Sequence, residues 1–93
     1  MAGNITCPVE CRCSSAQKVY CNSRDLLYVP EGIPADTKAL YLQDNLLTNS
    51  ADVDRALSKL HHLEKLMLYN NNLETIPQLD APWLRELRLN NNR

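Results

Sequence analysis

The 93-residue sequence has little of what enzymes and nucleic-acid-binding proteins need. It holds only two glycines, Gly3 and Gly32, so it has no glycine-rich loop to cradle a phosphate. The net charge is −1 with both signs interspersed, which gives no reason to expect nucleic acid or an anionic membrane as a partner. No apolar run approaches the roughly 18 residues of a membrane span. Ser-His-Asp and Cys-His arrangements are also missing, so the sequence predicts a protein without catalysis or a cofactor.

A metal site is not expected either. His61 and His62 are adjacent, so their side chains point apart, and no third ligand is identifiable nearby in the sequence. They fit a solvated turn before a strand. Asp52 and Asp54 are better explained as charges in the first turn of a helix than as calcium ligands or catalytic carboxylates.

The sequence does have four cysteines, which lie between Cys7 and Cys21 in the pattern C-x3-C-x-C-x7-C. Cys11 and Cys13 are one residue apart, a poor spacing for zinc, whereas an even count in a short segment favours disulfides. The residues alone permit three pairings. Disulfides imply an oxidising compartment, so we expect an extracellular protein, either secreted or on the cell surface. Asn4, in the sequon Asn4-Ile5-Thr6, is the candidate glycosylation site.

A Leu-x-Leu-x-x-Asn motif occurs three times. Its first leucine is Leu40, Leu66 or Leu87, at separations of 26 and 21 residues. Self-similarity at such a period is typical of a leucine-rich solenoid. Extending the register 21 residues backwards puts Val19 and Cys21 in the places of the two leucines. The cysteine segment is therefore predicted to contain a degenerate repeat that caps the stack.

Each motif alternates apolar and variable residues, which predicts a short strand with one buried face. Strands joined by crossovers from the same side pair in parallel. The asparagines of the motif are Asn45, Asn71 and Asn92. Each lies three residues beyond the motif's second leucine, where the chain must turn. Their recurrence in register favours a buried ladder of amides bonded to backbone groups, over the common alternative of solvent-facing turn residues.

The longer first repeat predicts a helix over residues 51–60 on the convex side, with Ser50 as its N-cap. Val29 and Ile76 occupy equivalent positions, each before a proline. The shorter second repeat predicts an extended or turn-like return instead of a helix, with Trp83 covering the convex edge.

Three segments resemble the N-terminal cap of extracellular leucine-rich repeat proteins: Cys7-Pro8-Val9-Glu10-Cys11-Arg12-Cys13, Val19-Tyr20-Cys21-Asn22 and Val29-Pro30-Glu31-Gly32-Ile33-Pro34. The sequence is similar to fibronectin-leucine-rich-transmembrane proteins and small leucine-rich proteoglycans. It is also similar to variable lymphocyte receptors and platelet glycoprotein Ib alpha. The resemblance implies the pairs Cys7–Cys13 and Cys11–Cys21.

The predicted fold is an α/β repeat: a short right-handed leucine-rich-repeat solenoid with a parallel β-sheet on its concave face and a disulfide-stapled N-terminal cap. The expected segments are a tail or fragment start (1–6), the cap (7–36), a long repeat (37–62), a short repeat (63–83) and the start of a truncated third repeat (84–93). Because that third repeat has no successor in the sequence, we expect self-association through its open edge.

Side chains between the strand leucines are predicted to face the concave side and to bind a protein partner. The candidates are Tyr20, Tyr41, Gln43, Lys65, Met67, Tyr69 and Arg88. The alternative is that tyrosines simply favour strands. The resemblance implies a binding module of an adhesion or guidance receptor. The rivals are a structural matrix protein that binds collagen or other matrix components, and a segment that only caps a larger protein.

Overall fold

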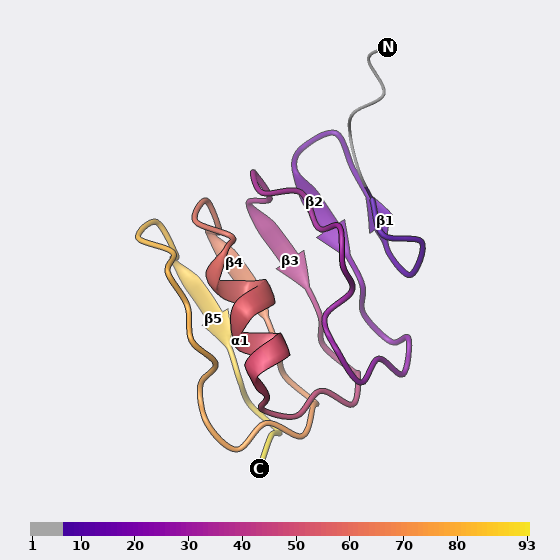
Figure 1. The fold of residues 1–93 in the computed structure, drawn as a ribbon, viewed down its shortest axis with the longest axis vertical. Helices are drawn as coiled ribbons and strands as arrows, with labels where there is room; N and C mark the ends of the chain where they lie inside the picture. The colour runs from indigo at the N-terminus through magenta and orange to yellow at the C-terminus, as the bar shows by residue number, and fades with distance from the viewer. Residues whose placement is uncertain (1–6) are drawn as a thin grey trace.

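The computed structural model describes residues 7–93, and these form one five-stranded sheet with strands in chain order (Figure 1). The first pair is antiparallel and every later pair is parallel. The strands are β1 (Arg12–Cys13), β2 (Lys18–Tyr20), β3 (Ala39–Tyr41), β4 (Lys65–Met67) and β5 (Glu86–Arg88).

The pairing register follows the repeated motif. Val19 lies opposite Leu40, Leu40 opposite Leu66, and Leu66 opposite Leu87. The prediction that the cysteine segment contains a degenerate repeat is therefore confirmed, because β2 occupies the place of one more repeat strand. The hairpin that adds β1 in antiparallel orientation was not foreseen from the repeat pattern.

Both disulfides implied by the resemblance are present, and the zinc alternative is excluded for these cysteines. Cys7 is bonded to Cys13 and Cys11 to Cys21, with Cα–Cα distances of 6.1 and 4.4 Å. Cys21 is fully buried and follows β2, so the second bridge ties the β1 hairpin to the first layer of the core. Cross-links of this kind lower the entropy of the unfolded chain, which matters for a domain with so small a core.

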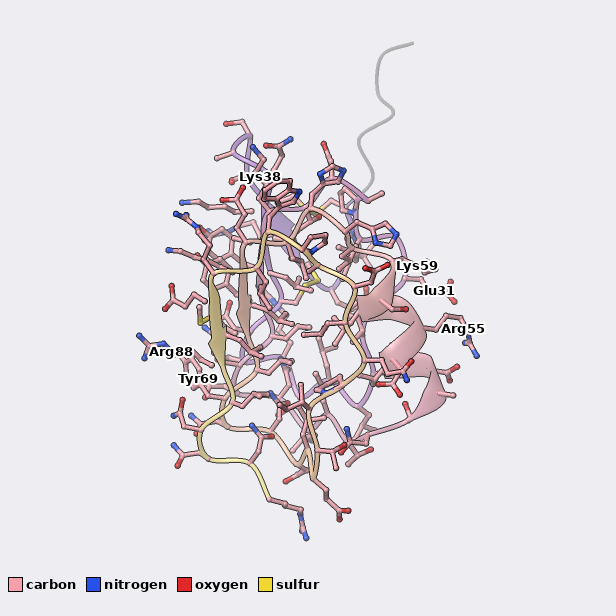
Figure 2. The ribbon with its side chains drawn as sticks, turned by 90° about the vertical axis from the view of Figure 1, so that its left-hand side faces the viewer. Glu31, Lys38, Arg55, Lys59, Tyr69 and Arg88 are labelled. Atoms are coloured by element: carbon pink, nitrogen blue, oxygen red, sulfur yellow. A yellow bond between two sulfur atoms is a disulfide. The ribbon has the colours of Figure 1, made fainter. Side chains whose placement is uncertain are left out.

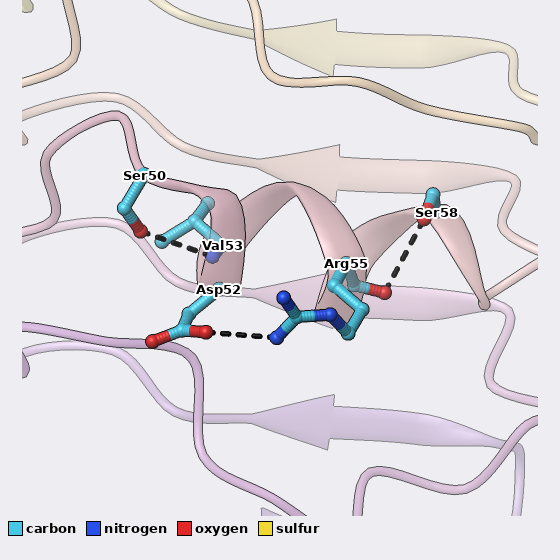
Figure 3. A network of polar contacts seen from close by, with 5 residues as sticks. All are labelled: Ser50, Asp52, Val53, Arg55 and Ser58. Atoms are coloured by element: carbon cyan, nitrogen blue, oxygen red, sulfur yellow. Dashed lines mark hydrogen bonds and ion pairs between the residues drawn. The ribbon is translucent and has the colours of Figure 1, made fainter.

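The helix α1 (Ala51–Ser58) packs on one face of the sheet (Figure 1). It ends two residues earlier than the predicted range of 51–60. Ser50 is the N-cap as predicted, and its hydroxyl accepts a hydrogen bond from the Val53 amide at 3.1 Å (Figure 3). The inward positions Val53 and Leu57 are both buried, as the amphipathic pattern requires.

The core lies between two layers. One layer is the inner face of the sheet, and the other is formed by α1 and the return loops. It is formed by the motif leucines and by the apolar residues that follow each turn, among them Leu40, Leu42, Leu47, Leu66, Leu68 and Leu73. Leu87 and Leu89, at the equivalent positions of the last strand, are only half-buried. They have a layer on one side only, since β5 pairs with β4 and with no other strand of the described residues.

Buried asparagines hold the turns at the ends of the strands, as predicted. Asn71 is 6% exposed, and its carbonyl oxygen accepts from the Leu47 amide at 3.0 Å. Its amide nitrogen donates to the carbonyls of Leu42 and Leu68 at 3.0 and 3.1 Å. One side chain thus joins the preceding repeat to its own, and it satisfies backbone groups that burial would otherwise leave unpaired.

The same geometry recurs one repeat earlier and one repeat later. Asn45 accepts from the Leu26 amide at 3.0 Å and donates to the Cys21 carbonyl at 2.9 Å. Asn92 accepts from the Leu73 amide at 2.9 Å. The three asparagines therefore form a continuous ladder, which confirms the prediction of stacked turns.

The return of the second repeat has no helix, as predicted, but Trp83 does not cover it. Ile76 is 62% exposed although its equivalent Val29 is buried, and Trp83 is 67% exposed, so neither covers the convex edge. Leu79 and Ala81 of the return pack against the core, and polar side chains fasten its backbone as well. The Asn49 carbonyl oxygen accepts from the amides of Glu74 and Thr75, at 2.7 and 3.0 Å.

Asp54 completes this attachment from within α1. Its carboxylate accepts from the Gln78 amide at 2.9 Å. Asp54 lies in the first turn of α1, as predicted, and the structure adds a hydrogen bond to the next repeat. Because hydrogen bonds fasten the backbone here, the return does not depend on burying Ile76.

We predict that Asn71→Ala lowers the free energy of unfolding by roughly 2–4 kcal/mol, because it leaves buried backbone groups unpaired. Asn72→Ala is the matched control. Asn72 lies next in the chain and its side chain makes no hydrogen bond within residues 7–93, so its loss should cost less than about 0.5 kcal/mol. Urea unfolding followed by circular dichroism measures both. Equal stability of the two variants would contradict the ladder.

Candidate functional site

The sheet has one covered and one uncovered face. Val19, Leu40 and Leu66 point into the core, so the residues on either side of them point away from it. Figure 2 shows Tyr69 and Arg88 on the opposite side of the sheet from Arg55 and Lys59, which belong to the helix side. We call the uncovered side the open face; its residues are Arg12, Lys18, Tyr20, Ala39, Tyr41, Gln43, Lys65, Met67, Tyr69, Glu86 and Arg88.

An aromatic stack lies at the cap end of the open face. The rings of Tyr20 and Tyr41 are parallel to within 7° and their centroids are 4.7 Å apart. The guanidinium carbon of Arg12 lies 5.6 Å from the centroid of the Tyr20 ring. Stacking and the cation–π contact restrain all three side chains, which lowers the entropy that a partner must remove on binding.

Arg12 was not among the residues that the sequence selected. It reaches the open face because β1 turns back along β2 and pairs Arg12 with Tyr20. The repeated motif begins at β2, so it predicts the parallel strands that follow β2 but not the antiparallel strand β1 that precedes it. The short spacing between Cys11 and Cys13 was the available hint of a hairpin.

Met67 is less accessible than its strand position implied. It is 7% exposed, so the expectation of an exposed Met67 within a tyrosine patch is wrong. Met67 lies in register between Tyr41 and Arg88, whose long side chains flank it. It lines an open hollow of about 240 Å³ together with Tyr69, Glu86, Arg88 and Asn90.

Three charged side chains are linked at the β5 end of this face. Glu86 lies 3.8 Å from the Lys65 ammonium and 3.1 Å from the Arg88 guanidinium. One carboxylate is therefore shared by two cations. Lys18, at the other end of the face, has no ion-pair partner among the residues that the structure describes.

Gln43 carries an unsatisfied polar atom. Its side-chain carbonyl oxygen is buried and has no hydrogen-bond partner within residues 7–93. Such atoms are few in native proteins and call for an explanation. Gln43 was among the predicted binding residues, and it lies two residues beyond Tyr41, the last residue of β3.

A second hollow of about 1160 Å³ lies on the helix side, between the cap and α1. Its walls include Val9, Tyr28, Ile33, Arg55 and Lys59. In the described part of the chain, no three His, Cys, Asp or Glu residues converge as metal ligands. His61 instead contacts Asp80, with Nδ1 3.0 Å from the backbone carbonyl oxygen. The predicted acceptor Asn4 lies outside the described residues.

Comparison with known proteins defines the class. Residues 6–34 match the family described as leucine rich repeat N-terminal domain. Together with the parallel sheet and the two disulfides, this shows a leucine-rich-repeat fold with an N-terminal cap.

Two curated relatives are leucine-rich-repeat proteins. The chain is 39% identical over 70 residues to leucine-rich repeat transmembrane protein FLRT2 of Homo sapiens, covering 75% of this chain and 10% of that protein. It is 45% identical over 69 residues to leucine-rich repeat-containing protein 4 of Mus musculus, covering 72% of this chain and 10% of the relative. The chain thus spans about a tenth of the curated relatives that it matches.

A solved structure agrees with the fold over nearly the whole chain. It is the octameric complex of latrophilin 3, Unc5D and the leucine-rich repeats of FLRT2. The TM-score is 0.79 at 38% identity, with 94% of this chain and 26% of the other covered. Within residues 7–93, no helix has the length and apolarity that crossing a membrane requires.

Gln43 offers a test of the open face that needs no partner. We predict that Gln43→Met leaves the free energy of unfolding unchanged or raises it by up to about 1 kcal/mol, because it removes an unpaired buried acceptor. Gln43→Glu should instead cost roughly 1–3 kcal/mol, since it places a charge where no donor is available. Thermal and urea unfolding measure both. A clear loss of stability in Gln43→Met would show that the carbonyl is satisfied after all.

Proposed function

We propose that this chain is the N-terminal part of a right-handed leucine-rich-repeat solenoid in an adhesion or guidance receptor, and that it binds a protein ligand through its open, concave face. The observation that carries this is the restrained Arg12–Tyr20–Tyr41 stack on a sheet face that nothing in the described chain covers. Tyrosine and arginine are enriched among the residues that dominate binding energy, especially where they are held in place before binding.

The relatives support a protein as the ligand. FLRT2 was solved in a complex with latrophilin 3 and Unc5D, in which its leucine-rich repeats take part. This chain covers only a quarter of that repeat array and a tenth of the full-length relative. Cell-surface ectodomains are therefore the first class of partner to test.

The two disulfides support an extracellular location, on the cell surface or secreted. We include glycosylation at Asn4 in the proposal, since the sequon would be accessible to modification in that compartment. Mass spectrometry of the protein from mammalian cells, with and without glycosidase, tests it. An unmodified Asn4 would remove this part of the proposal and leave the binding face untouched.

Screening against cell-surface ectodomains, with latrophilin 3 and Unc5D included and with collagen as a matrix control, identifies a partner. We predict that Tyr41→Ala then weakens the affinity about 10-fold or more, as expected for a central aromatic anchor. Tyr28→Ala is the matched control, because Tyr28 is an exposed tyrosine on the helix side. Surface plasmon resonance measures both. Equal affinity of the two variants would contradict binding through the open face. Binding of collagen alone would favour a matrix protein.

We also propose self-association of the 93-residue chain through the half-buried Leu87 and Leu89 at β5. An uncovered strand edge with apolar neighbours invites pairing. We predict a mass that rises with protein concentration in light scattering, and that Leu89→Lys abolishes the rise by placing a charge there. A constant monomer mass, with slow amide exchange across residues 86–88, would show that the edge is closed in solution.

A further inference from the structure

The open face and the helix side differ in charge. Four cations lie on the open face, Arg12, Lys18, Lys65 and Arg88, together with the single carboxylate of Glu86. The chain as a whole has a net charge of −1, so this positive balance is a property of the face and not of the protein. On the helix side, by contrast, Asp52 and Arg55 form an exposed ion pair at 2.8 Å, and α1 carries two carboxylates and one cation.

The ion pairs within the chain do not neutralise all of these cations. Glu86 is shared by Lys65 and Arg88, so the two cations have one carboxylate between them. Lys18 has no carboxylate within ion-pair distance in the described part of the chain. Arg12 lies over the Tyr20 ring, which does not cancel its charge. The face is therefore able to attract anionic groups at both ends.

A recess lies among the charges, and Met67 and Tyr69 line it together with three polar residues. The hollow of about 240 Å³ has nearly buried Met67 among its lining residues, with Tyr69 on one side and the Glu86–Arg88 pair at the other. Methionine adapts its shape to what packs on it, so the recess suits an aliphatic or aromatic side chain.

We propose that the partner of the open face is an acidic protein segment, with carboxylates that meet Lys18, Lys65 and Arg88 and an apolar side chain that enters the recess beside Met67. This inference rests on the proposed function and specifies the chemistry of its ligand. A sulfated polysaccharide fits less well. It has no apolar side chain for the recess beside Met67.

Synthetic polypeptides of defined composition test this on the 93-residue chain before a partner is known. The probes are a glutamate–tyrosine copolymer, a glutamate–alanine copolymer of the same length and glutamate content, and heparin. We expect the glutamate–tyrosine copolymer to bind about 10-fold more tightly than the glutamate–alanine copolymer, because only the former fills the recess. Added salt should weaken binding by screening the charges.

Matched variants locate the binding. Lys18→Ser with Arg88→Ser removes two charges from the open face, and Arg55→Ser with Lys59→Ser removes two from the helix side. The first pair should weaken copolymer binding about 10-fold and the second pair by less than about 2-fold, since charge attraction is local at moderate salt. Lys18→Arg with Arg88→Lys keeps both charges and should retain binding, and circular dichroism confirms folding of each variant.

Four results would overturn the inference: equal binding of the two copolymers, tighter binding of heparin, equal weakening by both double-serine variants, or no binding to any probe. The proposed function fails separately, because it is judged by Tyr41→Ala against a folded ectodomain. An ectodomain that needs Tyr41 but is unaffected by Lys18→Ser with Arg88→Ser would keep the binding face and reject its acidic ligand.

Discussion

The asparagine ladder is the interaction on which the other features depend. Each repeat strand is only three residues long, so the sheet supplies few hydrogen bonds per layer. Where a strand ends, the backbone must turn inwards and bury groups that would remain unpaired. Asn71 satisfies backbone groups in two neighbouring repeats at once. A longer side chain at this position would not fit. A charged side chain would lack one of the two roles, donor or acceptor.

The open face follows from this arrangement. The ladder fixes where each strand ends, and the motif leucines fix which face it buries. The intervening side chains are then set in columns across the sheet, with Tyr20 opposite Tyr41 and Met67 opposite Arg88. Stacking of the two tyrosines and sharing of Glu86 by two cations are consequences of that spacing. The proposed binding surface consists of the positions that differ between repeats, and the repeated leucines and asparagines decide where those positions lie.

The two returns on the helix side of the sheet are attached to the core in different ways. On the helix side, α1 contributes buried Val53 and Leu57, while the shorter second return is fastened by Asn49 and Asp54. These hydrogen bonds fix the backbone in addition to the packing of Leu79 and Ala81, while Ile76 stays exposed. Repeats of unequal length can therefore stack on one sheet, because their returns need not use the same kind of contact.

The sequence by itself determined the strand register, the inward leucines, the ladder and the N-cap at Ser50. These features depend on the alternation of apolar residues and on the spacing between repeats, and both can be read from the sequence alone. The tertiary structure alone decided which outward residues are accessible. Met67 is covered by neighbours from strands more than 20 residues away, and Arg12 joins Tyr20 through an antiparallel hairpin outside the repeat period. Accessibility and side-chain pairing depend on lateral neighbours, and a repeat pattern specifies the order of those neighbours but not how their side chains fill the space between them.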